Sequence, residues 1–146
     1  MIKRGTIPKG VMENIRGLLL EQPFHRFCGI KIVKMEPGYG VIRLKAGPNV
    51  VNPVGVFHGG ILYALMDVAC YVGIVPTLNE GENAVSHDAH FSILRSAKTG
   101  STLELRGRTD KRGKNIAFIR VEAWTVDKGK ETLVATGMLT KSITHI

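Results

Sequence analysis

The sequence predicts an α+β fold in which an antiparallel β-sheet wraps around one long central helix. The first observation is the apolar run over residues 59–75, roughly 25 Å long as a helix. Its apolar side chains lie on all sides, as in a helix surrounded by protein. The second is a set of strand-like segments, two before this run and four after it. The third is the short, Gly-containing links between them, which favour antiparallel neighbours curled about the helix.

The segments before the central helix are short. Residues 9–20 carry apolar side chains at helical spacing (11, 12, 15, 18 and 19), which predicts an amphipathic helix ended by Pro23. Residues 29–46 alternate apolar and polar side chains on both sides of Pro37-Gly38, which predicts two strands around a turn. A loop rich in Gly, Pro and Asn follows over residues 47–57.

The segments after the helix are longer. Pro76 and the stretch NEGEN end the helix. Four strands are then expected in a meander over residues 84–95, 101–112, 115–126 and 131–144, separated by SAKTG, KRGK and DKGK. With no internal repeat or linker, residues 1–146 form a single domain. This architecture is the hotdog fold.

Composition narrows the class of protein. A hydrophobic content of 44% and a charged content of 22% are typical of a globular domain. No run of about 18 uninterrupted apolar residues is present and Asp67 divides the best candidate, so no membrane span is expected. The N-terminal residues MIKRGTIPKG contain no apolar core of an export signal, which favours a cytoplasmic protein. Cys28 and Cys70 lack metal-ligand spacing and are expected to be reduced core residues rather than a disulfide, with no metal site.

The chain is basic, with a net charge of +8 and a pI of about 9.8, which favours anionic partners such as nucleic acids or phosphorylated metabolites. Seven basic residues gather in one stretch: Arg95, Lys98, Arg106, Arg108, Lys111, Arg112 and Lys114. These residues either lie on a solvent-exposed strand face and its turn, or they bind an anion. RNA binding is not expected, because aromatic residues make up only 6% of the chain and nucleic-acid modules stack bases on exposed aromatics.

The central segment carries the candidate chemistry. His58-Gly59-Gly60 opens the helix, where glycines let a ligand approach free backbone N–H groups at the positive end of the helix dipole. The turn is either an oxyanion site or simply a tight entry to the helix. Asp67 lies on a face with Gly60, Tyr63, Ala64, Cys70, Tyr71 and Ile74. It is either a structural carboxylate held by Tyr or Ser hydroxyls, or a general base or nucleophile kept away from water, with Ser86 as an orienting hydroxyl.

This pattern resembles a known family. Asn52 precedes His58-Gly59-Gly60 by six residues, Asp67 follows His58 by nine, and Ser86 opens the next strand. The set is similar to the hotdog acyl-CoA thioesterases of the phenylacetyl-CoA (PaaI-like) type. The segments PFHRFCGIKI, HFSILRSAKTG, GKNIAFIRVEAW and LVATGMLTK resemble further parts of that family, so the similarity covers nearly the whole chain.

The resemblance implies a reaction and roles for these residues. The Gly59 N–H would polarise the thioester carbonyl, and Asn52 would position substrate or water. Asp67 would come from the other subunit of a homodimer, often within a tetramer, to activate water or attack directly. Ser86 would orient that water and His58 would shape the turn. Coenzyme A would be part of the substrate, with no separate cofactor, and its phosphates would lie near Arg95, Lys98, Lys111, Arg112 and Lys114.

Two positions depart from the family pattern, which leaves the reaction class unchanged and the acyl specificity open. His90 stands where Asn is common, and Ser96 where Pro is common. His90 lies two pleats from Ser86 and is expected on the same face, either as a second polar group of the site or as an interface histidine. Gly60, Tyr63 and Tyr71 are expected to line the acyl pocket together with residues 9–28.

Other functions of the same fold stay open from the sequence. A non-catalytic acyl-CoA-binding module, acting as a sensor or regulatory domain, would keep the pocket but would not need Asn52, Asp67 and Ser86. A dehydratase of this fold resembles a His/Glu site on the central helix, whereas this helix carries an Asp and no Glu.

Overall fold

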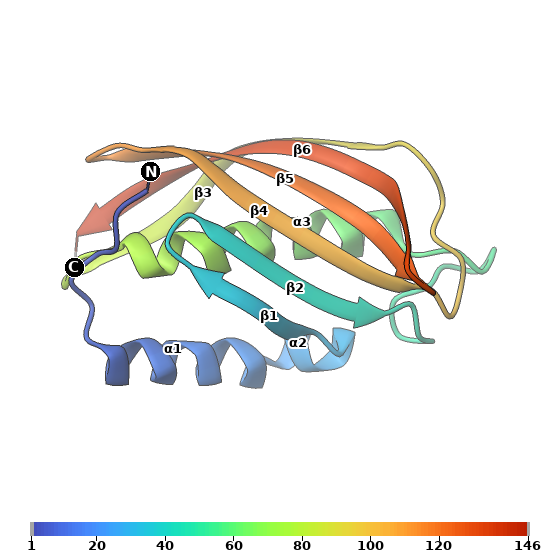
Figure 1. Cartoon of the computed structure of the whole chain (residues 1–146). Helices are drawn as coiled ribbons and strands as arrows, with labels where there is room; N and C mark the ends of the chain where they lie inside the picture. The colour runs from blue at the N-terminus through green and yellow to red at the C-terminus, as the bar shows by residue number, and fades with distance from the viewer. Residues whose placement is uncertain (1, 146) are drawn as a thin grey trace.

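The computed structural model describes residues 2–145 and confirms the α+β hotdog architecture. Six antiparallel strands form one sheet in the order β1-β2-β4-β5-β6-β3, and the sheet curves around α3 (Figure 1). The elements in chain order are α1 (Lys9–Glu21), α2 (Pro23–Cys28), β1 (Lys31–Glu36), β2 (Tyr39–Lys45), α3 (Gly59–Ile74), the 3-10 turn η1 (Val75–Thr77), β3 (Glu82–Ile93), β4 (Thr102–Arg112), β5 (Ile116–Asp127) and β6 (Lys130–His145).

Helix α3 is the centre of the core and packs chiefly against β4 and β2. Glycines on the two strands permit this close approach. A Cβ at Gly40 would stand 2.3 Å from the Ala69 carbonyl oxygen, and one at Gly107 would stand 2.9 Å from Cys70 Cα. The segment Gly59–Thr77 has the length and hydropathy of a membrane span, but here the sheet covers much of its apolar surface.

One side of α3 is left open by the sheet, which corrects the expectation of a helix enclosed on all sides. Leu62, Leu65, Met66 and Ala69 are fully buried, whereas the opposite side is partly or largely exposed. That open side carries Gly60, Tyr63, Ala64, Asp67 and Tyr71. A single curved sheet covers only the half of a helix that it faces, so the apolar character of the remaining side is not satisfied within one chain.

The expected four-strand meander is wrong for its first strand. Strands β4, β5 and β6 follow one another as a meander, but β3 pairs with β6 at the far edge of the sheet instead of with β4. The link over residues 94–101 therefore crosses the end of the sheet, where Lys98 forms an isolated bridge with Val56. As a result β3 and β1 are the two edge strands (Figure 1).

A β-bulge in β3 changes which way its side chains point. Ser86 pairs with Lys141, but the register shifts before Asp88, which pairs with Thr140. The extra residue, His87, exchanges the two faces for the rest of the strand. Side chains that share a face by simple alternation on either side of residue 87 therefore lie on opposite faces of the sheet.

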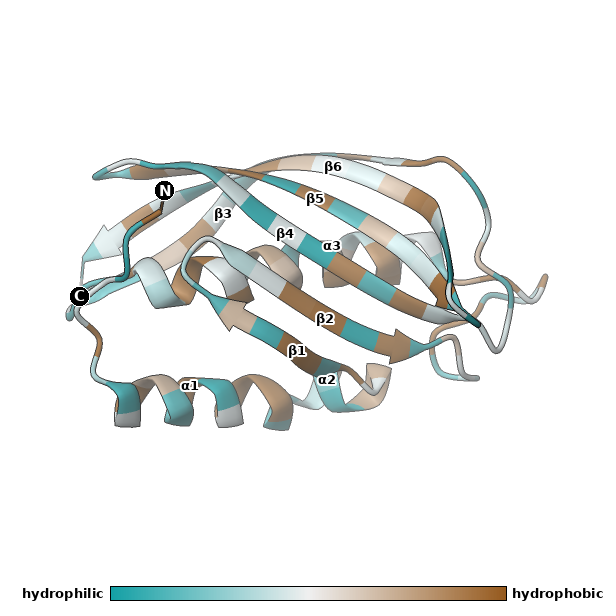
Figure 2. Cartoon of the chain, in the orientation of Figure 1, coloured by the Kyte–Doolittle hydropathy of each residue, from teal (hydrophilic) through white to brown (hydrophobic). Residues whose placement is uncertain are grey.

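The N-terminal region forms two helices where one was expected. Helix α1 ends at Glu21, and Pro23 begins a second helix, α2, because Pro fits the first turn of a helix well. Both helices lie beside β1, and α1 alternates hydrophilic and hydrophobic residues along its length (Figure 2). The two cysteines are buried and unlinked, as expected, Cys28 at the end of α2 and Cys70 in α3.

Candidate active site

Asp67 is the centre of a three-residue polar cluster between α3 and the β3–β6 edge of the sheet. The Ser86 hydroxyl donates to Asp67 Oδ1 over 2.6 Å, and Lys141 Nζ donates to the same oxygen over 2.9 Å. Lys141 Nζ also donates to Ser86 Oγ over 2.7 Å. The predicted neighbourhood of Asp67 and Ser86 is therefore present, but the carboxylate has an ammonium partner that the sequence analysis did not identify.

Lys141 is buried on the inward face of β6. Its side chain is 3% exposed, and it alternates with the buried Leu139 and Ile143 on the same strand. A lysine in that alternation is costly to bury unless a counter-charge accompanies it. The sequence did carry this signal, as a single charged residue in the inward register of LTKSI, but only the fold shows that the counter-charge is Asp67.

A hollow of about 390 Å³ opens beside Asp67. Leu19 from α1 and His25 from α2 form part of its wall, together with Val68, Tyr71, Ala84, Val85, Ser86 and Lys141. The Asp67 side chain is 42% exposed and faces this space. The Tyr71 hydroxyl donates to Asn83 Oδ1 over 3.0 Å, and burial raises the pKa of Tyr71, so the phenol stays neutral. Asp67 thus borders a hollow whose wall contains both apolar and polar side chains.

The turn before α3 exposes one backbone donor selectively. His58 Nδ1 accepts hydrogen bonds from the N–H groups of Gly60 (3.1 Å) and Ile61 (3.4 Å) and so caps the helix. Within residues 2–145 the Gly59 N–H has no hydrogen-bond partner. A Cβ at Gly60 would stand 3.1 Å from the His58 ring, which explains the second glycine. The His58 ring thus caps the helix and leaves the Gly59 N–H available to a ligand.

Asn52 organises the loop before this turn. Its Oδ1 accepts from the N–H groups of Val54 (3.1 Å) and Val56 (3.2 Å), a side-chain turn typical of Asn. This loop hydrogen-bonds to the turn through the His58 N–H and the Val50 carbonyl, 2.8 Å apart. The amide oxygen of Asn52 is therefore used within the chain, and the amide nitrogen is the group left for a substrate or a water.

Gly59 and Asp67 are too far apart in one chain to act on one small group. Eight residues separate them on α3, which corresponds to about 12 Å along the helix axis. Tyr63 lies between them on the open side and packs against Phe91, with ring centroids 5.3 Å apart. One protomer therefore contains both halves of the predicted site but does not bring them together.

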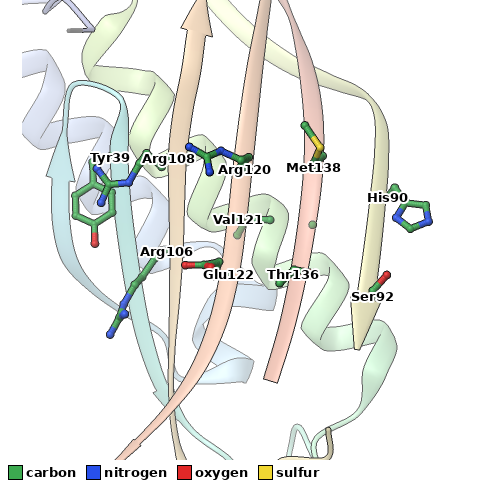
Figure 3. Close-up of a pocket in the computed structure, with 11 residues that line it drawn as sticks. Tyr39, His90, Ser92, Arg106, Arg108, Arg120, Val121, Glu122, Thr136 and Met138 are labelled. Atoms are coloured by element: carbon green, nitrogen blue, oxygen red, sulfur yellow. The ribbon is translucent and has the colours of Figure 1, made fainter. Parts of the chain in front are cut away.

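His90 lies on the other face of the sheet from Ser86, so the expectation that they share a face is wrong. Because of the bulge at His87, His90 pairs with the exposed Met138 on the outer face, away from α3. There it borders a groove of about 410 Å³ that crosses β2, β4, β5 and β6 (Figure 3). Its charged lining consists of Arg106, Arg108, Arg120 and Glu122.

The basic residues predicted to contact phosphates are scattered. Arg112 is held in a nearly buried ion pair with Glu82 and donates to the Gly113 carbonyl over 2.7 Å, which makes it a structural residue of this chain. Arg95 is exposed and donates to the Leu133 carbonyl. Lys98 lies in the β3–β4 link, Lys111 is exposed on β4, and Lys114 borders a hollow that also contains Lys3 and Arg4.

Comparison with known proteins agrees with the fold and identifies a family. The family model of the thioesterase superfamily matches residues 54–132. Human acyl-coenzyme A thioesterase 13 is 27% identical over 94% of this chain and 97% of its own length. The PaaI protein of the Escherichia coli phenylacetic acid degradation operon superposes with a TM-score of 0.79 at 21% identity, covering 92% of each chain.

A protein from Streptococcus mutans, solved with bound acetyl-CoA, superposes with a TM-score of 0.71 at 25% identity, covering 80% of this chain and 90% of the other. Since the family model spans more than half of the chain, and the turn, Asp67 and Ser86 all lie within it, the family is shown. The chain therefore belongs to the thioesterase superfamily and is a thioester hydrolase with the hotdog fold.

Proposed function

We propose that this protein is an acyl-CoA thioesterase that hydrolyses a CoA thioester to a carboxylic acid and free CoA. The observation that carries the proposal is the Asp67 carboxylate, held by Lys141 and Ser86 beside an open hollow. The human relative named as an acyl-CoA thioesterase and the acetyl-CoA bound to the Streptococcus mutans protein support CoA thioesters as the substrate class.

The site is proposed to form between two subunits of a homodimer. Gly59 and Asp67 of one chain are about 12 Å apart, so one thioester carbonyl is served by the Gly59 N–H of one protomer and Asp67 of its partner. Two features favour such a pairing. The open side of α3 carries apolar groups without cover, and β3 is an edge strand with exposed residues, among them Val85 at 50% exposure. A tetramer would be a pair of such dimers.

The proposed chemistry uses water and groups of the protein. The Gly59 N–H, at the positive end of α3, stabilises the oxyanion, a contribution of about 3–4 kcal/mol in comparable sites. Asp67 takes a proton from water as the water oxygen attacks the carbonyl carbon, or attacks that carbon itself and is then freed by water. The C–S bond breaks, the acid is released, and the CoA sulfur receives the proton.

Other predicted residues keep supporting roles in this proposal. Asn52 Nδ2 contacts the substrate or the water, and Gly60, Tyr63 and Tyr71 line the pocket that holds the acyl chain. The CoA phosphates meet exposed cations, for which Arg95, Lys98, Lys111 and Lys114 remain candidates. Arg112 is the exception, because its charge is already balanced by Glu82.

The test is a thiol-release assay on short, long and aryl CoA thioesters with the wild type and Asp67→Asn. We expect turnover by the wild type and a loss of at least about a thousandfold in Asp67→Asn, measured on folded protein because the thermal midpoint should fall when the buried Lys141 loses its counter-charge. Asp88→Asn is the matched control, since Asp88 is an exposed acid on β3, the strand that carries Ser86, and lies outside the cluster. Intact acyl-CoA bound at stoichiometry without thiol release would show a sensor module and refute the proposal.

A further inference from the structure

Lys141 is a buried cation to which the proposed reaction assigns no step. It projects from β6 toward α3, between Ser86 on β3 and Ala117 on β5 in the sheet register. Its side chain is 3% exposed, and its ammonium lies 5.4 Å from the centre of the Tyr71 ring. Within residues 2–145, Asp67 is the one carboxylate that forms an ion pair with it. The two charges therefore depend on each other.

The hydrogen bonds of the cluster have a defined direction. A lysine ammonium can only donate, so Ser86 Oγ accepts from Lys141 and turns its own hydrogen toward Asp67 Oδ1. Asp67 Oδ1 then receives two donors, one from Ser86 and one from Lys141. Oδ2 receives none among the described residues, and the side chain is open to the hollow. The geometry leaves Oδ2 as the oxygen that faces an incoming molecule.

Neighbouring titratable groups do not replace Lys141 as the counter-charge of Asp67. Burial raises the pKa of the Tyr71 phenol and of the Cys70 thiol, so both are neutral at pH 7. His25, across the hollow on α2, donates through Nδ1 to the Leu19 carbonyl over 2.7 Å. Lys141 is the one cation in the described chain whose nitrogen lies within 4 Å of an Asp67 oxygen.

We propose that Lys141 is a positioning residue of the thioesterase reaction, which balances the charge of Asp67, holds its Oδ1 and aims its Oδ2 at the reacting water or carbonyl. The proposal rests on the acyl-CoA thioesterase function and on Asp67 as its base or nucleophile. In the base route, a water proton passes to Oδ2 as the water oxygen bonds to the carbonyl carbon. The C–S bond then breaks, and the proton passes from Oδ2 to the departing sulfur, which leaves as the thiol and frees the carboxylate. Lys141 takes no part in the proton transfer and acts through Asp67.

The test compares Lys141→Met, which removes the charge at similar volume, with Lys141→Arg, which retains it. In Lys141→Met we expect kcat to fall by at least about tenfold with little change in KM. The acid limb of the kcat profile should move to higher pH, because a carboxylate without its counter-charge binds a proton more readily. Lys141→Arg should recover most of kcat and the wild-type limb. Lys130→Met, an exposed change on the same strand, is the matched control.

A purely structural role is separated from positioning by the pH profile, which a loss of folded protein would not displace. A Lys141→Met enzyme with wild-type kcat and acid limb overturns the proposal, as does Lys141→Arg if its acid limb moves as far as that of Lys141→Met. If Lys141→Met does not fold, Lys141→Arg still decides. An Arg variant that folds and keeps the wild-type KM but loses most of kcat contradicts a role that needs a buried positive charge beside Asp67.

Failure of the underlying function gives a different result. If Asp67→Asn hydrolyses CoA thioesters as the wild type does, the proposed function fails in its catalytic residue. If Asp67→Asn is inactive and Lys141→Met behaves as the wild type, only the role of Lys141 fails.

Discussion

Asp67 Oδ1 and Lys141 Nζ lie 2.9 Å apart although 74 positions separate the two residues in the chain. The lysine is almost completely buried, whereas the acid is 42% exposed, so the pair reaches from the core to the surface of the hollow. A charge in the core is stable only with a close partner, and here that partner is also the group proposed to react. The position of the Asp67 carboxylate and its counter-charge therefore depend on how β6 packs in the sheet.

A mixing experiment tests whether Gly59 and Asp67 act across two subunits. Gly59→Val should block approach to the backbone donor, and Asp67→Asn removes the base, so each variant alone should be inactive. In a symmetric dimer, equal mixing of unfolded chains followed by refolding yields hybrids in which one of the two sites is intact, so about one quarter of wild-type activity returns. Thiol release measures the activity, and light scattering confirms the dimer. Activity that stays at the level of the separate variants would argue for a site within one chain.

The His58 cap predicts a separable effect on stability. His58→Ala removes the acceptor for two N–H groups of α3 and should lower the free energy of unfolding by about 1 kcal/mol. His58→Asn should lose only a few tenths, because Asn is a favoured capping residue. Urea unfolding followed by circular dichroism provides both values. Equal losses in the two variants would mean that capping is not what His58 contributes.

The Arg112–Glu82 pair predicts a pH dependence of folding. Although burial raises the pKa of Glu82, the Asn79 N–H and the Arg112 guanidinium outweigh it and hold the pKa below its ordinary value. A depressed carboxyl pKa contributes stability that is present above the unfolded value of about 4.3 and is lost as the pH falls through the folded value.

Glu82→Gln should accordingly lower the free energy of unfolding at pH 7 by about 3 kcal/mol, because Arg112 is left nearly buried without a counter-charge. The difference in free energy of unfolding between the wild type and Glu82→Gln should shrink toward zero in acid. There the wild type no longer gains stability from the Arg112–Glu82 ion pair. Glu80→Gln, an exposed neighbour, is the control and should change stability little. Denaturant titrations from pH 3 to pH 7 measure the difference. A constant difference at every pH would contradict the assignment.

The wall of the Asp67 hollow predicts which residue limits the acyl group. Leu19 is partly buried and borders the hollow, whereas its neighbour Leu18 is 69% exposed. Leu19→Trp should fill part of the space and reduce kcat/KM for long acyl-CoA by at least about tenfold more than for acetyl-CoA. Leu18→Trp should leave this ratio unchanged. A Leu19→Trp enzyme with an unaltered chain-length profile would place the acyl chain elsewhere.

Local patterns were sufficient to predict most of the elements and the position of Asp67 on α3. Helical and strand periodicities are short-range, so they located α3 and the strands within a few residues of their observed bounds. Two predictions that depended on pairing partners were wrong, the meander position of β3 and the face of His90. Both depend on long-range contacts, since a strand has no local signal for its neighbour and one bulge exchanges its two faces.

The sequence by itself determined that a Gly-Gly turn opens an apolar helix and that one carboxylate follows on that helix, because both properties follow from residue type and a spacing of 1.5 Å per residue. Only the tertiary structure decided that Lys141 neutralises this carboxylate and that Oδ2 is its free oxygen. The register of β6 against β3 sets those contacts, and such a register arises from the packing of the whole sheet around α3.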